Sequence, residues 1–202
     1  MSEPRCERAS SQHADGLLAL FESAGSGCFC NYWHFAGDKN AWLEQCYIKP
    51  ELNRAALVAR LAEPELCGVV GLDGAGVVRG WLKLMRATGV PRLYDQRVYR
   101  NLPCFADTDR ESTYAVGCCY ISETERGRGL AKALLAAAVS AAQAAGASAL
   151  EAFPRGAPPA ESPPLRPDEV WMGPEALFLQ AGFTRVSDFR PYPVLRLHLR
   201  HQ

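Results

Sequence analysis

The chain has 202 residues with 22 basic and 22 acidic side chains, so its formal net charge is zero, and 48% of its residues are hydrophobic. This composition is typical of a globular protein, and the charge balance argues against a nucleic-acid partner. No apolar run approaches the roughly 18–20 residues that span a bilayer, which argues against a membrane partner. The polar segment 1–15 lacks the apolar centre of a signal peptide, so we expect a cytoplasmic protein.

Helical patterns dominate the N-terminal third of the chain. An apolar run predicts a first helix over residues 9–23, and a short helix follows at 41–47. Pro50 opens another helix, because proline fits the first helical turn. The intervening segment 28–35 is rich in aromatic residues and cysteine, and it can either pack the core or line a substrate pocket.

The middle of the chain alternates between strands and one long helix. Two strands joined by a Gly-rich turn are predicted at 66–72 and 77–85. The long connection at 88–111 has the length of a surface insertion or a binding loop. A buried strand is predicted at 114–121, and a helix with one apolar face at 130–145.

The C-terminal part returns to short elements around a proline-rich stretch. A strand is predicted at 147–153, and six prolines mark an extended insertion at 154–167. A helix follows at 169–180, and the last strands are predicted at 182–188 and 192–199.

The eight cysteines do not form a recognisable metal site. In the cytosol they should stay reduced. The Cys28-x-Cys30 pair lacks a second Cys-x-x-Cys or a His pair that would complete a zinc site, so we expect no metal. His34 can be a buried histidine or a pocket base, and no pattern decides between them.

A Gly-Arg-Gly turn separates the strand at 114–121 from the helix at 130–145. The first amides of a helix have no partner within it, and the helix dipole makes that end partly positive. Glycines allow close approach of a ligand, and arginines add planar donor groups. The turn is therefore predicted to bind a pyrophosphate through Arg126, Gly127, Arg128, Gly129, Leu130 and Ala131.

Other phosphate-binding motifs fit this turn less well. A Walker A loop needs Gly-Lys-Ser/Thr, and a Rossmann fingerprint needs a third glycine where Lys132 stands. A Gly-rich helix entry with two solvated arginines is the remaining interpretation.

The pattern Arg126-x-x-Gly129-x-Ala131 resembles the acetyl-CoA signature of the GNAT superfamily of N-acetyltransferases. The segment 177–183, Leu-Phe-Leu-Gln-Ala-Gly-Phe, is similar to that family's Leu-Tyr-x-x-x-Gly-Phe segment. This resemblance covers roughly residues 66–199. It implies an α/β fold of one GNAT-like domain, with a central mixed, mostly antiparallel sheet that is flanked by helices and splayed at the cofactor strand.

The resemblance also implies a reaction. The protein would be an N-acyltransferase that uses acetyl-CoA as co-substrate and moves the acetyl group directly to an amine acceptor. Residues 1–64 would form acceptor-side helices and a first strand. The acceptor, a small-molecule or peptide amine, cannot be identified from the sequence, and a homodimer is possible.

In GNAT enzymes the pantetheine arm pairs with the cofactor strand like an added strand. By resemblance, Cys119, Tyr120 and Ile121 provide this edge, and a backbone amide near Cys119 polarises the thioester carbonyl. Glu151 stands where ribosomal-protein N-terminal acetyltransferases of the superfamily carry Leu-Glu-Val with a proton-accepting glutamate. It is therefore the candidate base, and an ordinary strand glutamate is the other interpretation.

The family often places a tyrosine general acid where this chain has Phe178, which cannot donate a proton. Tyr192 or a water could protonate the CoA thiolate instead. Strong acid help is not essential, since a thiol pKa is about 8.5. A non-catalytic acyl-CoA-binding module is therefore the alternative function. Glu123 and Glu125 are further candidate bases, although a solvated turn suits them better.

Overall fold

The structure is a computed structural model that describes residues 4–106, 108–158, 161, 163, 165, 166 and 169–199. The predicted proline-rich insertion at 154–167 lies partly outside the described residues, at positions 159, 160, 162, 164 and 167. Among the residues that the structure describes, no helix has the length and apolar character that crossing a bilayer requires.

The N-terminal part forms one strand and three helices, which are β1 (Arg5–Arg8), α1 (Ala14–Ser23), α2 (Lys39–Tyr47) and α3 (Pro50–Ala62). Asp38 caps α2 by accepting a hydrogen bond from the amide of Ala41 at 2.9 Å. The helix predicted over 9–23 begins only at Ala14, because a short 3-10 turn precedes it.

The rest of the described chain supplies most of the sheet and three α-helices. Its elements are β2 (Gly68–Leu72), β3 (Val78–Arg86), α4 (Pro91–Tyr94), β4 (Thr113–Ile121), α5 (Leu130–Ala144), β5 (Ala149–Ala152), α6 (Glu175–Gln180), β6 (Thr184–Ser187) and β7 (Val194–His198). The helix predicted at 169–180 is much shorter than expected. Gly173 has a φ of 91° and Pro174 is extended, so neither continues a helix, and α6 starts at Glu175.

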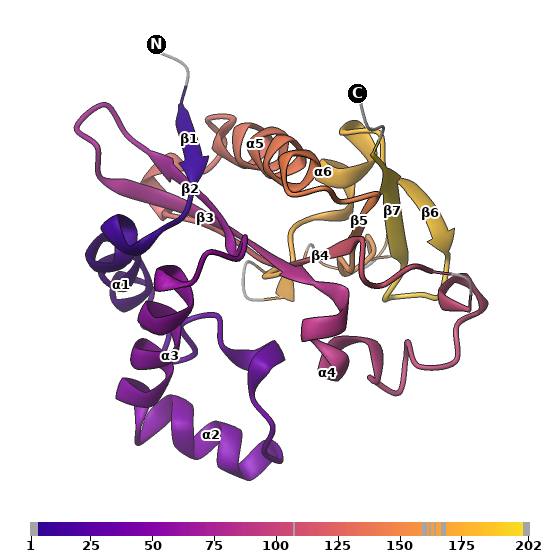
Figure 1. Cartoon of the computed structure of the whole chain (residues 1–202), viewed down its shortest axis with the longest axis horizontal. Coiled ribbons are helices and arrows are strands. Elements are labelled where there is room, and N and C mark those ends of the chain that lie inside the picture. The colour runs from indigo at the N-terminus through magenta and orange to yellow at the C-terminus, as the bar shows by residue number, and fades with distance from the viewer. Residues whose placement is uncertain are drawn as a thin grey trace.

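One mixed sheet organises these elements in the order β1-β2-β3-β4-β5-β7-β6 (Figure 1). Only the β4–β5 pair is parallel, and every other neighbouring pair of described strands is antiparallel. The predicted α/β fold with a central, mostly antiparallel sheet flanked by helices is therefore confirmed.

The sheet opens between β4 and β5. Residues 113–115 of β4 pair with residues 149–151 of β5, whereas β4 continues to Ile121. The distal part of β4 consequently has no β5 partner on that side, which is the splay that the family resemblance implies.

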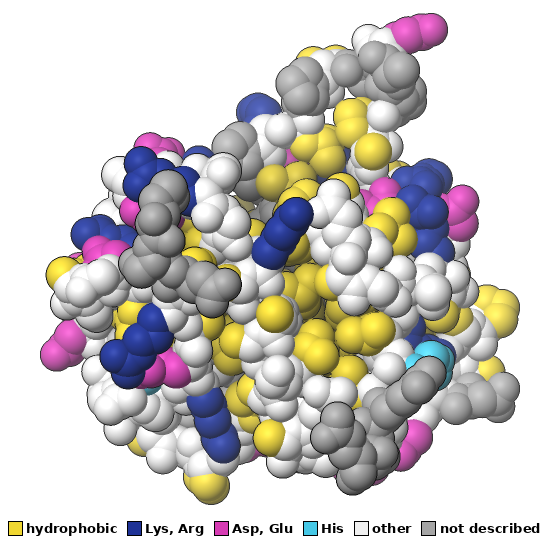
Figure 2. All heavy atoms as spheres, turned by 90° about the horizontal axis from the view of Figure 1, so that it is seen from above, with side chains coloured by type: hydrophobic (Ala, Val, Ile, Leu, Met, Phe, Trp, Pro, Cys, Tyr) yellow, Lys and Arg dark blue, Asp and Glu magenta, His cyan; other side chains and the backbone are white. Residues whose placement is uncertain are grey.

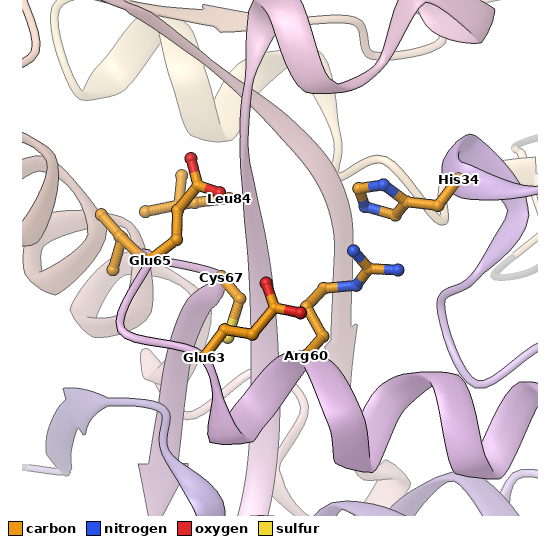
Figure 3. Close-up of a pocket in the computed structure, with 7 residues that line it drawn as sticks. His34, Arg60, Glu63, Glu65, Cys67 and Leu84 are labelled. Carbon is orange, nitrogen blue, oxygen red and sulfur yellow. The ribbon is translucent and has the colours of Figure 1, made fainter.

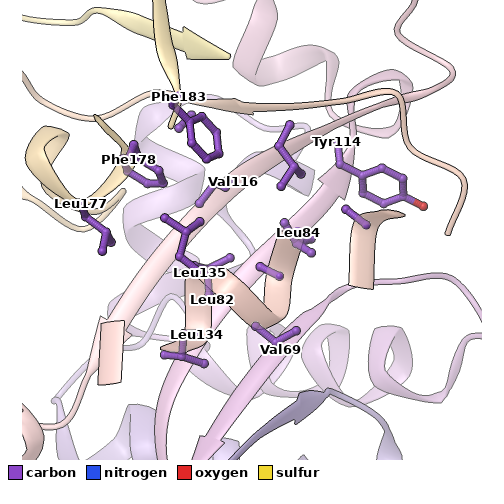
Figure 4. Packing of buried hydrophobic residues seen from close by; sticks show 14 of the residues in the cluster. Val69, Leu82, Leu84, Tyr114, Val116, Leu134, Leu135, Leu177, Phe178 and Phe183 are labelled. Carbon is purple, nitrogen blue, oxygen red and sulfur yellow. The ribbon is translucent and has the colours of Figure 1, made fainter. Parts of the chain in front are cut away.

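Helices cover the two faces of the sheet. Helix α5 packs against β1, β2 and β3, and α1 and α3 lie on the opposite side (Figure 1). Along β3, Leu82 and Leu84 join the core under α5, whereas Trp81 joins the core beneath α1. Figure 4 shows the core cluster of α5, in which Leu134 and Leu135 meet the strand side chains. Burial of these apolar side chains is the main force that holds α5 to the sheet.

Two strand glycines let α5 approach closely. A Cβ atom on Gly71 would lie 2.6 Å from Cδ1 of Leu130, and one on Gly80 would lie 2.8 Å from Cδ1 of Leu134. Such contacts are too short, so a side chain at either position would require the ends of Leu130 or Leu134 to move.

Candidate active site

The Gly-Arg loop, residues 126–131, connects the end of β4 to α5. Gly127 and Gly129 adopt left-handed backbone conformations with φ of 73° and 88°, and Gly129 is the N-cap of α5. A Cβ atom at either position would meet nothing within 4 Å. Their backbone conformation, rather than a lack of space, therefore explains why glycine stands at these two positions.

The loop presents donor groups without protein acceptors. Within the described part of the chain, the backbone N–H groups of residues 127–131 donate no hydrogen bond. Arg126 lies 3.6 Å from Glu123, and Arg128 lies 3.6 Å from Glu125. The arginine side chains are 40% and 58% exposed, so these ion pairs are weak and can yield to an anion.

An apolar groove adjoins the loop between α5 and α6. Its volume is about 410 Å³, and it is lined by Lys132, Leu135, Ala136, Val139, Leu177, Gln180, Ala181 and Leu197. Hydrophobic side chains gather in the middle of the face that carries α5 and α6 (Figure 2). A groove of this size and character suits the apolar faces of a small ligand.

The predicted cofactor edge of β4 lies next to the Gly-Arg loop. Nε of Arg126 donates to the carbonyl of Ile121 at 3.2 Å, which joins the loop to the strand end. The Cys119 amide, predicted to polarise a thioester, donates instead to the carbonyl of Trp171 at 2.8 Å. Burial raises the pKa of the Cys119 thiol to about 12, so the side chain stays protonated.

Glu151 is a fully buried member of an ion-pair network. One carboxylate oxygen accepts from Nε and Nη2 of Arg196 at 2.9 and 2.5 Å, and the other accepts from the Tyr94 hydroxyl at 2.7 Å. Nη2 of Arg196 also donates to the carbonyl of Cys104 and to the Thr108 hydroxyl, at 2.8 and 2.6 Å. Burial, and then the charge of Glu151, hold the pKa of Tyr94 well above its usual value.

Phe178 and Tyr192 occupy very different environments. Phe178 is completely buried and packs at 5.4 Å, ring centroid to ring centroid, against Phe183. Tyr192 is 38% exposed in the connection between β6 and β7. Solvent can therefore reach the phenol of Tyr192, whereas Phe178 is part of the hydrophobic core.

His34 borders a separate small cavity of about 40 Å³ that Arg60 and Cys67 also line (Figure 3). Burial, followed by the charges of Lys83 and Arg60, lowers the pKa of His34 to about 2, so its ring is neutral near pH 7. The buried Nε2 atom of His34 has no hydrogen-bond partner within the described residues. This cavity has room for about one water and none of the loop residues 126–131 lines it.

No group of three or more His, Cys, Asp or Glu side chains suited to a metal ion occurs in the described ranges. Cys28 contacts Ser26 at 3.1 Å, and a hydrogen bond to Cys30 together with burial raises the pKa of the Cys28 thiol far above its usual value. The Cys28 thiol is therefore protonated near pH 7.

Two contacts at the site had not been predicted from the sequence. Arg196 forms the partner of Glu151 across the β5–β7 register. A single charged residue in the apolar segment 192–199 was the available signal, because buried charges usually occur in pairs. Trp171 approaches Cys119 through its backbone carbonyl, which gives no signal in the sequence.

The model of the acetyltransferase (GNAT) family matches residues 62–157. No curated protein sequence matches the chain significantly. The fold is similar to that of yncA from Salmonella typhimurium with its cofactor acetyl-CoA, at 16% identity and a TM-score of 0.55, over 100% of this chain and 96% of the other.

Two other solved structures are similar over nearly the whole chain. The GNAT domain of PAT from S. lividans shows 19% identity and a TM-score of 0.57, over 98% of this chain and 92% of the other. The PaiA N-acetyltransferase from Thermoplasma acidophilum, in complex with coenzyme A, shows 9% identity and a TM-score of 0.55, over 98% and 99% of the two chains. At these identities the similarity establishes a shared fold. The family match places segment 62–157 among GNAT-family sequences, as the resemblance of the Gly-Arg loop predicted.

Proposed function

We propose that the protein is an N-acyltransferase that transfers an acetyl group from acetyl-CoA directly to an amine. The observation that carries this proposal is the set of backbone amides at 127–131, which have no acceptor among the described residues, together with Arg126 and Arg128, directly beside the splayed edge of β4. A helix N-terminus with free amides and adjacent arginines suits a pyrophosphate. The apolar groove between α5 and α6 suits the adenosine end of the same ligand.

The pantetheine arm would run along Cys119, Tyr120 and Ile121. In this arrangement the Cys119 amide would donate to the thioester carbonyl and stabilise the oxyanion that develops during attack. The amine must be neutral to attack, and its proton leaves to a base or to water. The CoA thiolate is then the leaving group, and Tyr192 is the candidate that protonates it.

The contacts of Glu151 favour a positioning role over a role as the proton acceptor. Both carboxylate oxygens are engaged, and the last β4–β5 pair, Ala115 with Glu151, lies at the start of the splay. Glu151 would keep the two strands in place where they separate, and a water would accept the proton of the amine.

Thiol release with acetyl-CoA and pools of amines tests this function. The pools are small-molecule amines, peptides with free N-termini, lysine peptides and amino sugars. Turnover with one pool supports the transferase, and a lower rate for Tyr192→Phe with unchanged affinity for acetyl-CoA supports the proposed acid. Binding of CoA without turnover on any pool favours the non-catalytic module. The presence of Phe178, which cannot donate a proton, is consistent with that alternative. Absence of CoA binding would overturn both functions.

A further inference from the structure

A segment of the chain itself occupies the gap between β4 and β5. The carbonyl of Trp171 accepts from the Cys119 amide of β4 at 2.8 Å. Three residues later, Pro174 forms a parallel bridge with Arg155, which follows β5. Residues 170–174, here named the strap, therefore pair with both sides of the splay.

The indole of Trp171 anchors the strap to the N-terminal part of the chain. It stacks on Trp33 with 5.5 Å between ring centroids and 23° between planes. Trp33 is held in turn by a hydrogen bond from Nε1 to the carbonyl of Gly117 on β4, at 3.0 Å. The Trp171 ring also meets Tyr32 edge-on, with 6.2 Å between ring centroids, and it remains 39% exposed.

A tight turn brings the strap against the core. The amide of Gly173 donates to the carbonyl of Val170 at 2.7 Å, and Gly173 has a φ of 91°. A Cβ atom at Gly173 would lie 3.0 Å from the ring of Phe178 and 3.5 Å from Cβ of Cys119. Only glycine combines this backbone conformation with this close approach.

We propose that the strap is a displaceable occupant of the acyl-CoA site, and that Trp171 determines how readily the site opens. This inference rests on the proposed function. An N–H group donates one strong hydrogen bond, so the Cys119 amide cannot serve the Trp171 carbonyl and a thioester carbonyl together. The pantetheine arm replaces one backbone partner with another, so the side-chain contacts of the strap resist opening: the stacking of Trp171 on Trp33 and the burial of Met172 in the core. The apparent dissociation constant equals the intrinsic one divided by the fraction of molecules that are open, so a smaller open fraction means weaker apparent binding.

Amide hydrogen exchange of the full chain tests the occupied state without any ligand. The Cys119 amide should be protected in the free protein to the same degree as the paired amides of β4. Trp171→Ala should accelerate exchange of the Cys119 amide about threefold to tenfold, which is the range that loss of one stacked aromatic pair implies. Fast exchange of Cys119 in the unaltered protein would overturn the strap.

Binding measurements with two probes separate this inference from the proposed function. CoA carries the pantetheine arm, whereas adenosine 3′,5′-bisphosphate lacks it. Trp171→Ala should bind CoA about threefold to tenfold more tightly than the unaltered protein and should bind the bisphosphate equally. Phe189→Ala, at an exposed aromatic position outside the strap, is the matched control and should change neither affinity.

Gly173→Ala provides a second variant that weakens the strap without touching Trp171. Its Cβ is strained at a φ of 91° and crowds Phe178, so it should also tighten CoA binding. Equal or weaker CoA binding by folded Trp171→Ala and Gly173→Ala proteins would overturn the inference while leaving the proposed function intact. If neither probe binds any variant, the proposed function fails instead.

Discussion

Arg196 directs two nitrogens at a single oxygen of Glu151, at 2.5 and 2.9 Å, while Tyr94 donates to the other oxygen at 2.7 Å. Glu151 is 0% exposed, so this carboxylate depends on its partners for compensation of its charge. The network joins β5, β7 and the connection that leads to β4.

Removing one side of this pair should therefore destabilise the protein. We expect Glu151→Leu to lower the free energy of unfolding by about 3–5 kcal/mol, because it leaves the Arg196 charge uncompensated. The double variant Glu151→Leu with Arg196→Met should recover most of this loss. Urea denaturation measures both. A double variant that is no more stable than Glu151→Leu alone would show that the ion pair itself is strongly favourable.

The two arginines of the Gly-Arg loop should contribute to CoA affinity. We expect Arg126→Ala and Arg128→Ala each to weaken CoA binding about tenfold or more, since each removes a charge-assisted contact to phosphate. Calorimetric titration measures the dissociation constant. Arg54→Ala, which removes an exposed arginine that pairs with Glu22 on α1, is the control. Unchanged affinity in both loop variants would contradict the assignment of the loop.

The backbone conformation of the same loop can be tested independently of charge. Gly129 has a φ of 88°, so Gly129→Ala should strain the start of α5 by about 1–2 kcal/mol and weaken CoA binding. Gly74→Ala is the matched control, because its turn position has free space within 4 Å and no left-handed φ. Similar CoA affinities of the two variants would mean that the left-handed geometry is dispensable.

The neutral His34 should make stability fall in mild acid. Its folded-state pKa of about 2 lies below the usual value near 6.5, so the unfolded chain binds a proton that the folded chain does not. Stability is therefore lost as the pH falls through about 6.5, by up to about 2 kcal/mol between pH 7 and pH 5. Denaturant unfolding of the unaltered protein and of His34→Leu at both pH values measures the difference.

The exposed His198, at the end of β7, allows a control for that experiment. His198→Leu should retain the loss of stability at pH 5, and His34→Leu should lose it. If both variants lost the same stability between pH 7 and pH 5, a group other than His34 would cause the loss.

The elements with strong periodicity were predictable from the sequence. The apolar face of α5 predicts the bounds of this helix to within one residue: the prediction is 130–145, and the helix spans Leu130–Ala144. Strand β1 had no such pattern, because Arg5–Arg8 alternates little and joins the sheet through backbone pairing with β2. Predictions from side-chain patterns miss elements whose stability comes from neighbouring backbone.

The site was predictable to a similar extent. Sequence motifs predicted the loop at 126–131 and the strand edge near Cys119 as parts of a candidate site, and these two segments lie next to each other through Arg126 and Ile121. The occupation of that edge by Trp171 could not be predicted, because every residue carries the carbonyl that makes the contact. The burial of Glu151 could not be predicted either, because its charge is paired with Arg196, which lies 45 residues further along the chain.

The closeness of α5 to the sheet has a consequence for the candidate phosphate site. Gly71 and Gly80 lie directly beneath Leu130 and Leu134 in the first turns of α5, and the start of α5 carries the amides that would hold phosphate. The thioester end of the same ligand would lie near Cys119, on a different element. A methyl group at Gly71 would require the Cδ1 atom of Leu130, in the first turn of α5, to move. Through Leu130 and Leu134, the two glycines thereby link β2 and β3 to the end of α5 that would hold phosphate.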